Sequence, residues 1–322
     1  MRTLQQLFDR WNELVPVGQA RGLRVRPIRS LHENRAAGER RVAWLEAMVA
    51  PVGLNSQTFG VELEFVMPRT LSPDTLATLL TQAGVPTQVA MYGHSIPRDY
   101  WKIVTDGSLP HNGRELVSPP LQGQDGFDLL AKACRVLTSA RVKITVSCGF
   151  HVHVGYRAGT VNWLRNTVKM YAHYTPAVES LVSASRRRHG SRSTWCQPVR
   201  YNAVTMDRAL TAQEVVSAAY QTPRAGRHGT RYKAVNLESY WNYGTIEFRQ
   251  HQGTVDARKA EMWVRFCLRL STEAALTDTF NPAEHEATFE GLMGKVKATP
   301  AEVEYFTQRQ VQLGGYNANQ PR

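Results

Sequence analysis

Three short segments of the sequence carry pairs of charged or metal-binding residues at i, i+2 spacing. The pairs are Glu62 and Glu64 in GVELEF, His151 and His153 in FHVHVGY, and Glu247 and Arg249 in GTIEFRQ. Successive side chains of a strand point to opposite faces, so each pair shares one face and the apolar residues share the other. The pattern predicts three strands with an apolar back and a face that can do chemistry.

The chemistry that suits this face is the binding of divalent cations. Converging carboxylates repel one another and resist losing water unless a cation neutralises them. Several glutamates with a histidine suit a hard ion such as Mg²⁺ or Mn²⁺. Glu62 and Glu64, roughly 7 Å apart on a strand, can each anchor a separate ion, as a two-metal phosphoryl-transfer site requires. Arg249 is then placed to meet a phosphate as a bidentate donor.

Further candidates lie between and after these segments. Glu115 begins an apolar-backed extended run and is the preferred third carboxylate, whereas Asp106 belongs to an Asp-Gly turn and is the weaker candidate. Lys233 and Arg231 precede the third strand and are candidates for contacting phosphate. Asn236 is a further candidate for nucleotide binding, although asparagine at such a position more often caps or turns the chain.

The composition is that of a globular protein, with 322 residues of which 42% are hydrophobic and 20% charged. No stretch approaches the roughly 18 uninterrupted apolar residues that span a bilayer, and the start MRTLQQLFDRW lacks the apolar block of a signal peptide. We therefore expect a cytoplasmic protein without membrane contact. The four cysteines are scattered without a C-x-x-C pair, and we expect reduced, partly buried thiols.

The formal net charge of +12 favours anionic partners. Much of the excess lies in an Arg-rich stretch from Arg21 to Arg41 and in the run RRRHGSR from Arg186 to Arg192. These regions are either a solubilising surface or a binding surface for an acidic polymer or nucleic acid. The sequence carries no signal for an oligomeric state.

From Thr58 onward, strand-like and helix-like segments alternate. We expect extended segments at 59–66, 88–92, 101–105, 115–118, 150–156, 232–237 and 245–250. We expect helices at 73–83 with Ser72 as the N-cap, and at 126–139, 161–184, 212–220 and 255–272. Several strands alternate polar and apolar residues, which favours an α+β fold: a mostly antiparallel sheet with helices on one face and a site on the other.

The chain divides into three expected regions. Residues 1–57 form a basic N-terminal appendage with helical patterns at 4–15 and 41–50. Residues 58–275 form the catalytic domain. Residues 276–322 form a helical C-terminal extension that ends in a frayed Gly/Asn-rich tail.

Taken in order, the segments GVELEF, DGSL with ELVSP, HVHVG, RYKAVNL and GTIEFRQHQGT resemble the amidoligase family. Its members are carboxylate-amine ligases whose catalytic domain is similar to those of glutamine synthetase and glutamate-cysteine ligase. The resemblance covers roughly Thr58 to Leu270. It implies a sheet that forms a cleft for ATP and two or three divalent ions, and amide-bond formation through an acyl phosphate.

The resemblance also implies roles for individual residues. Glu62, Glu64 and Glu115 match metal ligands, as does His151 or His153, the choice between the histidines staying open. Glu247 matches a metal ligand, and Arg249 matches the residue that contacts the transferring phosphoryl group. Only Glu115, with Asp106 as the weaker candidate, stands where glutamine synthetase has a further pair of carboxylates, so a third ion is not implied with the same force.

Two rival functions are compatible with parts of the sequence. A zinc- or manganese-dependent hydrolase explains the H-x-H pair and the carboxylates but does not call for the Glu-x-Arg strand. A nucleic-acid-binding protein explains the net charge and the arginine clusters. The motifs G-x-x-x-x-G-K-[ST] and G-x-G-x-x-G are absent from the sequence, so no P-loop holds a nucleotide here.

Overall fold

The computed structural model describes residues 3–20, 25–28, 35–49, 57–90, 99–155, 161–220 and 230–315. Its centre is an eight-stranded sheet in the order β2-β3-β4-β1-β6-β8-β7, with β5 paired to β1. Every pairing is antiparallel except that between β2 and β3. The strands are β1 (Thr58–Val66), β2 (Thr87–Val89), β3 (Trp101–Val104), β4 (Gly113–Val117), β5 (Leu121–Gln122), β6 (Gly149–Gly155), β7 (Val235–Asn236) and β8 (Thr245–Gln252).

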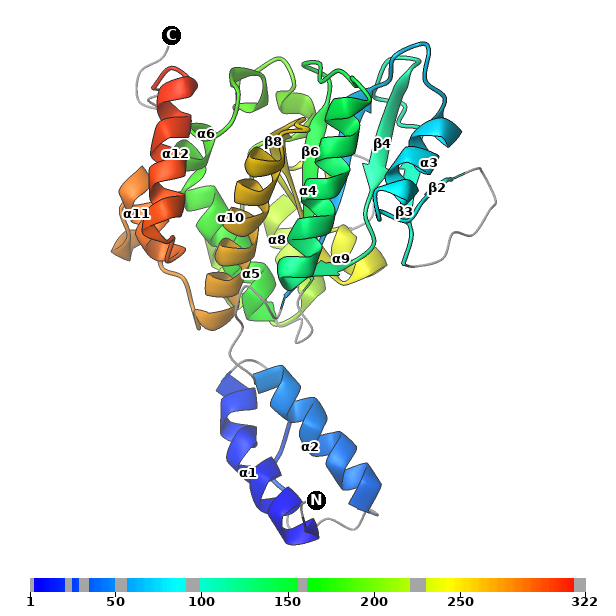
Figure 1. The fold of residues 1–322 in the computed structure, drawn as a ribbon. Helices are drawn as coiled ribbons and strands as arrows, with labels where there is room; N and C mark the ends of the chain where they lie inside the picture. Colours follow the sequence, from blue (N-terminus) through cyan, green and yellow to red (C-terminus); the bar gives the residue numbers. More distant parts are fainter. Residues whose placement is uncertain are drawn as a thin grey trace.

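Helices cover the apolar face of this sheet, and α10 lies at the centre of that layer between α4 and α5 (Figure 1). The α-helices are α1 (Leu4–Ala20), α2 (Arg35–Val49), α3 (Pro73–Gln82), α4 (Gly123–Ser139), α5 (Val161–His173), α6 (Thr175–Glu179), α7 (Ala203–Arg208), α8 (Ala212–Tyr220), α9 (Ser239–Tyr243), α10 (Ala257–Leu276), α11 (Phe289–Lys295) and α12 (Pro300–Gln312). None of the described helices combines the length and the apolar character needed to cross a membrane.

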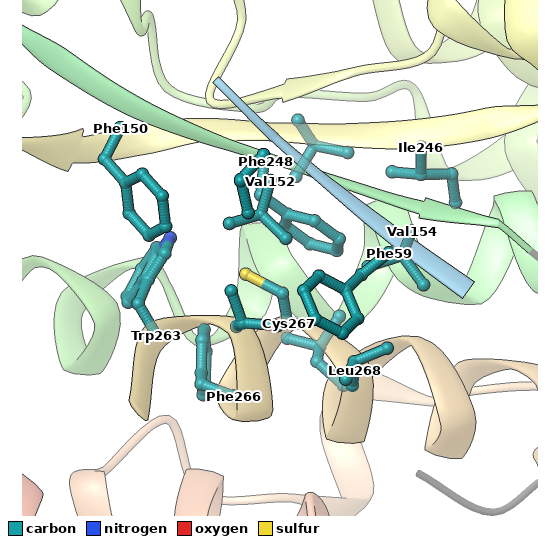
Figure 2. Close-up of a cluster of buried hydrophobic side chains, with 14 of the residues drawn as sticks. Phe59, Phe150, Val152, Val154, Ile246, Phe248, Trp263, Phe266, Cys267 and Leu268 are labelled. Carbon is teal, nitrogen blue, oxygen red and sulfur yellow. The ribbon is translucent and has the colours of Figure 1, made fainter. Parts of the chain in front are cut away.

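The core forms where the apolar backs of the strands meet the helices. Figure 2 shows Phe150, Val152 and Phe248 pointing from the strands toward α10, which contributes Trp263 and Leu268. All these side chains are buried. Alternation along each strand therefore places its ligand-type residues on the opposite face of the sheet.

The N-terminal helices have a hydrophobic cluster of their own. Leu7, Trp11 and Leu14 of α1 pack with Val42 and Leu45 of α2, and this cluster is distinct from the main core. The C-terminal helices α11 and α12, by contrast, contribute side chains to the main core. The three-region division with boundaries at 57 and 275 stays a prediction.

The α+β class and the mostly antiparallel sheet are confirmed. Ser72 caps α3 as expected, its side chain accepting a hydrogen bond from the Thr75 N–H at 3.1 Å. The four cysteines are free and buried. The segment Gln88 to Tyr92 is strand only as far as Val89, and residues 91–98 lie outside the described residues.

Two expected elements are corrected. The single helix expected over 161–184 is wrong, because α5 ends at His173 and α6 is a separate short helix with Pro176 in its first turn. Proline lacks the N–H that would continue the helical ladder and disfavours helix at the preceding residue. The strand expected over 232–237 is shorter and covers only β7, since Thr230–Tyr232 forms a 3₁₀ turn. The sequence analysis did not predict β5 or α7.

The central position of Phe248 yields a stability prediction. Phe248→Ala should lower the free energy of unfolding by about 3–5 kcal/mol, because the ring is fully buried and its loss leaves a cavity. Urea denaturation of the metal-free protein measures this, with the exposed Val204→Ala as a control expected to stay within about 0.5 kcal/mol of wild type. A loss below about 1 kcal/mol for Phe248→Ala would contradict the packing described.

Candidate active site

The antiparallel register brings the first two ligand-type strands together. Glu62 of β1 lies opposite His151 of β6, and Glu64 lies opposite Glu115 of β4. On the other side of β6, His153 lies opposite Glu247 of β8. Residues far apart in the sequence thus meet on one face because neighbouring antiparallel strands align residues directly opposite one another.

A β-bulge between β6 and β8 decides which residues of β8 reach this face. Between the pairs Phe150–His251 and Val152–Phe248, β8 contains one more residue than β6. Strict alternation would put His251 on the same face as Arg249, but after the bulge it packs at 4.9 Å from the Trp263 ring on the apolar side. Burial lowers the pKa of His251 to about 3, so this histidine is neutral and belongs to the core.

Glu62 bridges the two histidines. Its Oε2 lies 2.8 Å from Nδ1 of His151, and its Oε1 lies 3.1 Å from Nε2 of His153. Burial opposes ionisation of Glu62, but the hydrogen bonds to the two histidines outweigh burial and hold its pKa well below the usual range. Burial likewise opposes charge on His153, yet the contact with Glu62 and the charge of Glu247 raise its pKa. Without a metal ion, the contacts with the two histidines stabilise the charge of this carboxylate.

Glu64 is held by the backbone at the start of β6. Its Oε2 accepts a hydrogen bond of 2.6 Å from the Gly149 N–H, and its Oε1 lies 3.5 Å from Nε2 of His151. A Cβ on Gly149 would lie 2.7 Å from that same Nε2. Glycine is therefore required here for the His151 ring to stand beside Glu64.

Glu247 is clamped from two sides. Asn236 of β7 donates a hydrogen bond of 2.7 Å from Nδ2 to one of its oxygens, and Arg249 donates to the other. Burial opposes charge on Arg249, but the charges of Glu247 and Glu62 raise its pKa. The Oδ1 of Asn236 also accepts the Glu238 N–H at 2.9 Å, so this asparagine both shapes a turn and orients Glu247.

Glu115 lies close to three other carboxylates, those of Glu62, Glu64 and Asp106. Desolvation, the charge of Glu62 and the charges of Glu64 and Asp106 raise its pKa well above the usual value. Asp106 accepts the Ser108 N–H at 2.6 Å, which is the turn contact expected of an Asp-Gly pair. Its carboxylate nevertheless reaches the cluster, where it approaches Glu64 and Glu115.

Three overlapping groups of these side chains present ligand atoms within 4.8 Å of one another: Glu62, Glu115 and His151; Glu62, His153 and Glu247; and Glu64, Asp106 and Glu115. The donors are carboxylate oxygens with at most one nitrogen in each group. This chemistry fits a hard divalent cation such as Mg²⁺ or Mn²⁺. Because Glu62 and Glu115 each belong to two groups, the arrangement can hold more than one ion with shared carboxylates.

Two candidate phosphate ligands have their contacts elsewhere. The Nζ of Lys233 donates to Oε1 of Gln197 at 2.9 Å, and burial lowers the pKa of this amine. Arg231 lies over the ring of Tyr232, 5.2 Å from its centroid. Tyr232 packs edge-on against Trp195, which lines a small cavity beside the acidic cluster. A role for Lys233 and Arg231 in binding phosphate stays a prediction.

The sequence did not indicate which basic residues reach the site. The cavity, of about 20 Å³, is lined by Glu64, Ser108, Ser147, His151, Arg186, Arg192, Trp195 and Arg249. Its volume suits a single water molecule or ion. The run from Arg186 to Arg192 was recognised as basic, but only the packing of the 3₁₀ turn Ala184–Arg186 against β8 brings it here.

The comparisons with known proteins give one family. A family model described as "Putative amidoligase enzyme" matches residues 55–271, more than half of the chain. The chain therefore belongs to this amidoligase family, which confirms the resemblance in the sequence and indicates an enzyme of the ligase type. No curated protein compared with the chain matches it significantly.

Among solved structures, one titled "Crystal structure of novel glutamine synthase homolog" is 13% identical to this chain. The match covers 83% of this chain and 68% of that chain, with a TM-score of 0.35. At this score the likeness carries no argument about fold or function.

The raised pKa of Glu115 gives a pH-dependent prediction. A carboxyl whose folded pKa is raised stabilises the fold below its unfolded pKa, near 4, and loses that contribution as pH rises through the folded pKa. In metal-free protein, Glu115→Gln should therefore raise the free energy of unfolding by about 1–3 kcal/mol at pH 7 and change it little near pH 4. Urea denaturation in chelator measures both, with the exposed Glu286→Gln as control. A loss of stability at pH 7 would contradict the description.

The close approach at Gly149 gives a second prediction. Gly149→Ala should weaken Mn²⁺ binding about 10–100-fold, because the new methyl group displaces the His151 ring from Glu64. Calorimetric titration with Mn²⁺ measures the affinity. Gly294→Ala is the matched control, since a Cβ there has no neighbour within 4 Å. Equal Mn²⁺ affinity in Gly149→Ala and wild type would show that His151 is not a ligand.

Proposed function

We propose that the chain is an ATP-dependent carboxylate-amine ligase that forms an amide or isopeptide bond through an acyl phosphate. One observation carries the proposal: Glu62 and Glu115 each belong to two of the three overlapping groups of metal-ligand atoms, on the same sheet face that presents Arg249. Family membership supports the ligase class, and the carboxylate-rich donors support Mg²⁺ or Mn²⁺ with a phosphate substrate.

The proposed reaction has two steps. An oxygen of the substrate carboxylate attacks the γ-phosphorus of ATP, and ADP leaves. The amine of the second substrate then attacks the acyl carbon, inorganic phosphate leaves, and the amine gives up a proton. Bound divalent ions would neutralise the phosphates during transfer, with Glu62, Glu64, Glu115, Glu247 and the histidines as the residues that hold them.

The surroundings of Arg249 support its proposed role in stabilising the transferring phosphoryl group. Its guanidinium is buried, it stays charged beside Glu247, and its Nε has no hydrogen-bond partner among the described residues. A fixed cation in a site that excludes water stabilises developing negative charge strongly. These features support Arg249 as the planar donor of the proposed phosphoryl-transfer site.

The geometry gives less support to the zinc hydrolase. That function needs His151 and His153 on one ion with an open position for water. In the described residues they belong to different groups, His151 with Glu62 and Glu115, and His153 with Glu62 and Glu247. Binding of an acidic polymer or nucleic acid through the arginine-rich regions stays a prediction.

The test is calorimetric titration of ATP with and without Mg²⁺. Wild type should bind ATP in a Mg²⁺-dependent way, and Glu247→Gln and Arg249→Ala should each weaken that binding at least tenfold, because one removes a metal ligand and the other a charge-assisted phosphate contact. The exposed Glu290→Gln serves as a control with wild-type affinity. Unchanged ATP affinity in both site variants would contradict the proposal. Stoichiometric zinc in a protein that does not bind ATP would favour the hydrolase.

A further inference from the structure

The cavity beside the acidic cluster has a positively charged wall. Glu64 and His151 line one part of it, and Arg186, Arg192 and Arg249 line another. Arg249 is paired with Glu247, so its charge is compensated. The other two arginines come from the loop that follows α6 and take no part in the metal-ligand groups.

Arg186 is a buried cation that forms no ion pair with any of the described residues. Its side chain belongs to a residue only 3% exposed, and its Nη2 donates to the carbonyl oxygens of Ser147 and Cys148. Its Nε has no hydrogen-bond partner, and no carboxylate of the described residues lies within ion-pair distance. Burying an unpaired charge is costly, so such a residue is expected to meet an anion.

Arg192, a second arginine of this wall, is also uncompensated. It is partly buried, and within the described chain its guanidinium has neither a hydrogen bond nor an ion pair. Its backbone is fixed, since its N–H donates to the Ser185 carbonyl at 2.9 Å. Among the described residues, no hydrogen bond or ion pair thus fixes the guanidinium of Arg192 at the cavity.

The intervening arginines of the loop show a different use of the same residue type. Arg188 pairs with the buried Glu179 at 3.1 Å, and Arg187 donates to the Glu179 carbonyl at 3.0 Å. These two contacts anchor the loop to α6. Glu179 thus binds the two anchoring arginines. Among the described residues, Arg186 and Arg192 have no ion-pair partner at the cavity.

Arg186 lies directly against β6, the strand that carries His151. A Cβ on Gly149 would lie 3.3 Å from both terminal nitrogens of Arg186, so the guanidinium stacks closely on the start of β6. An anion bound by Arg186 and Arg192 would consequently lie in the cavity that Glu64 and His151 also line. Two arginine forks are the donors best suited to a planar or tetrahedral oxyanion.

We propose that Arg186 and Arg192 form an oxyanion subsite that holds the reacting group beside the metal cluster. The occupant is a phosphoryl or carboxylate group: the γ-phosphate of the nucleotide or the carboxylate that receives it. This inference rests on the proposed function for the origin of its occupant. The existence of the subsite itself depends only on the uncompensated arginines.

The first experiment needs no nucleotide. The thermal midpoint of the full chain is measured in inorganic phosphate and in acetate, each against chloride at equal ionic strength. Wild type should be stabilised by at least one of the two anions, and Arg186→Gln and Arg192→Gln should lose that shift. The exposed Arg200→Gln is the matched control and should keep it. Arg192→Gln removes no hydrogen bond or ion pair of the described fold, so it keeps the test valid if Arg186→Gln folds poorly.

The second experiment identifies the source of the oxyanion. Titration of Mg²⁺-ADP is compared with that of a non-hydrolysable Mg²⁺-ATP analogue. Variants that bind the analogue at least tenfold more weakly but bind ADP like wild type assign the subsite to the γ-phosphate. Variants that bind both nucleotides normally but lose the acetate shift assign it to the carboxylate substrate.

The outcomes separate this inference from the proposed function. An anion shift lost in both variants, in a protein that binds no nucleotide, would support the subsite and refute the ATP-dependent ligase. Mg²⁺-dependent ATP binding without any anion shift, and with normal affinity for the analogue in both variants, would refute the subsite and leave the ligase standing.

Discussion

Mutual repulsion among the carboxylates that converge on one sheet face is the constraint on which the rest of the structure depends. Desolvation and neighbouring charge raise the pKa of Glu115. The pKa of Glu62 is lowered instead, because two histidines contact its carboxylate. The fold tolerates this face since its opposite side is a continuous apolar core between the strands and α10. Burial of large side chains on one side thus offsets the electrostatic cost on the other.

The alternation of polar and apolar residues along the strands was the sequence feature that predicted the site. Glu62, Glu64, His151, His153, Glu247 and Arg249 were assigned to one kind of face from alternation alone, and the register brings them together. Alternation is a local property of the backbone, so a single sequence reveals it. The roles assigned to these residues are a separate matter, which metal and nucleotide binding must decide.

Other features could not be read from local pattern. The bulge in β8 sends His251 to the core, although its position in the sequence continues the alternation of Glu247 and Arg249. The arrival of Arg186 at the cavity depends on a loop that packs against β8, which is a long-range contact. The expected helix over 161–184 failed because the apolar pattern continues past a proline that the backbone cannot accommodate within one helix.

The two outermost strands of the sheet are short, with β2 spanning Thr87–Val89 and β7 spanning Val235–Asn236. A free edge invites another chain to add a strand, and the hazard grows with the length of unpaired backbone. Among the described residues, each of these terminal strands offers only a few such groups, so the two strands are poor templates for the addition of another strand.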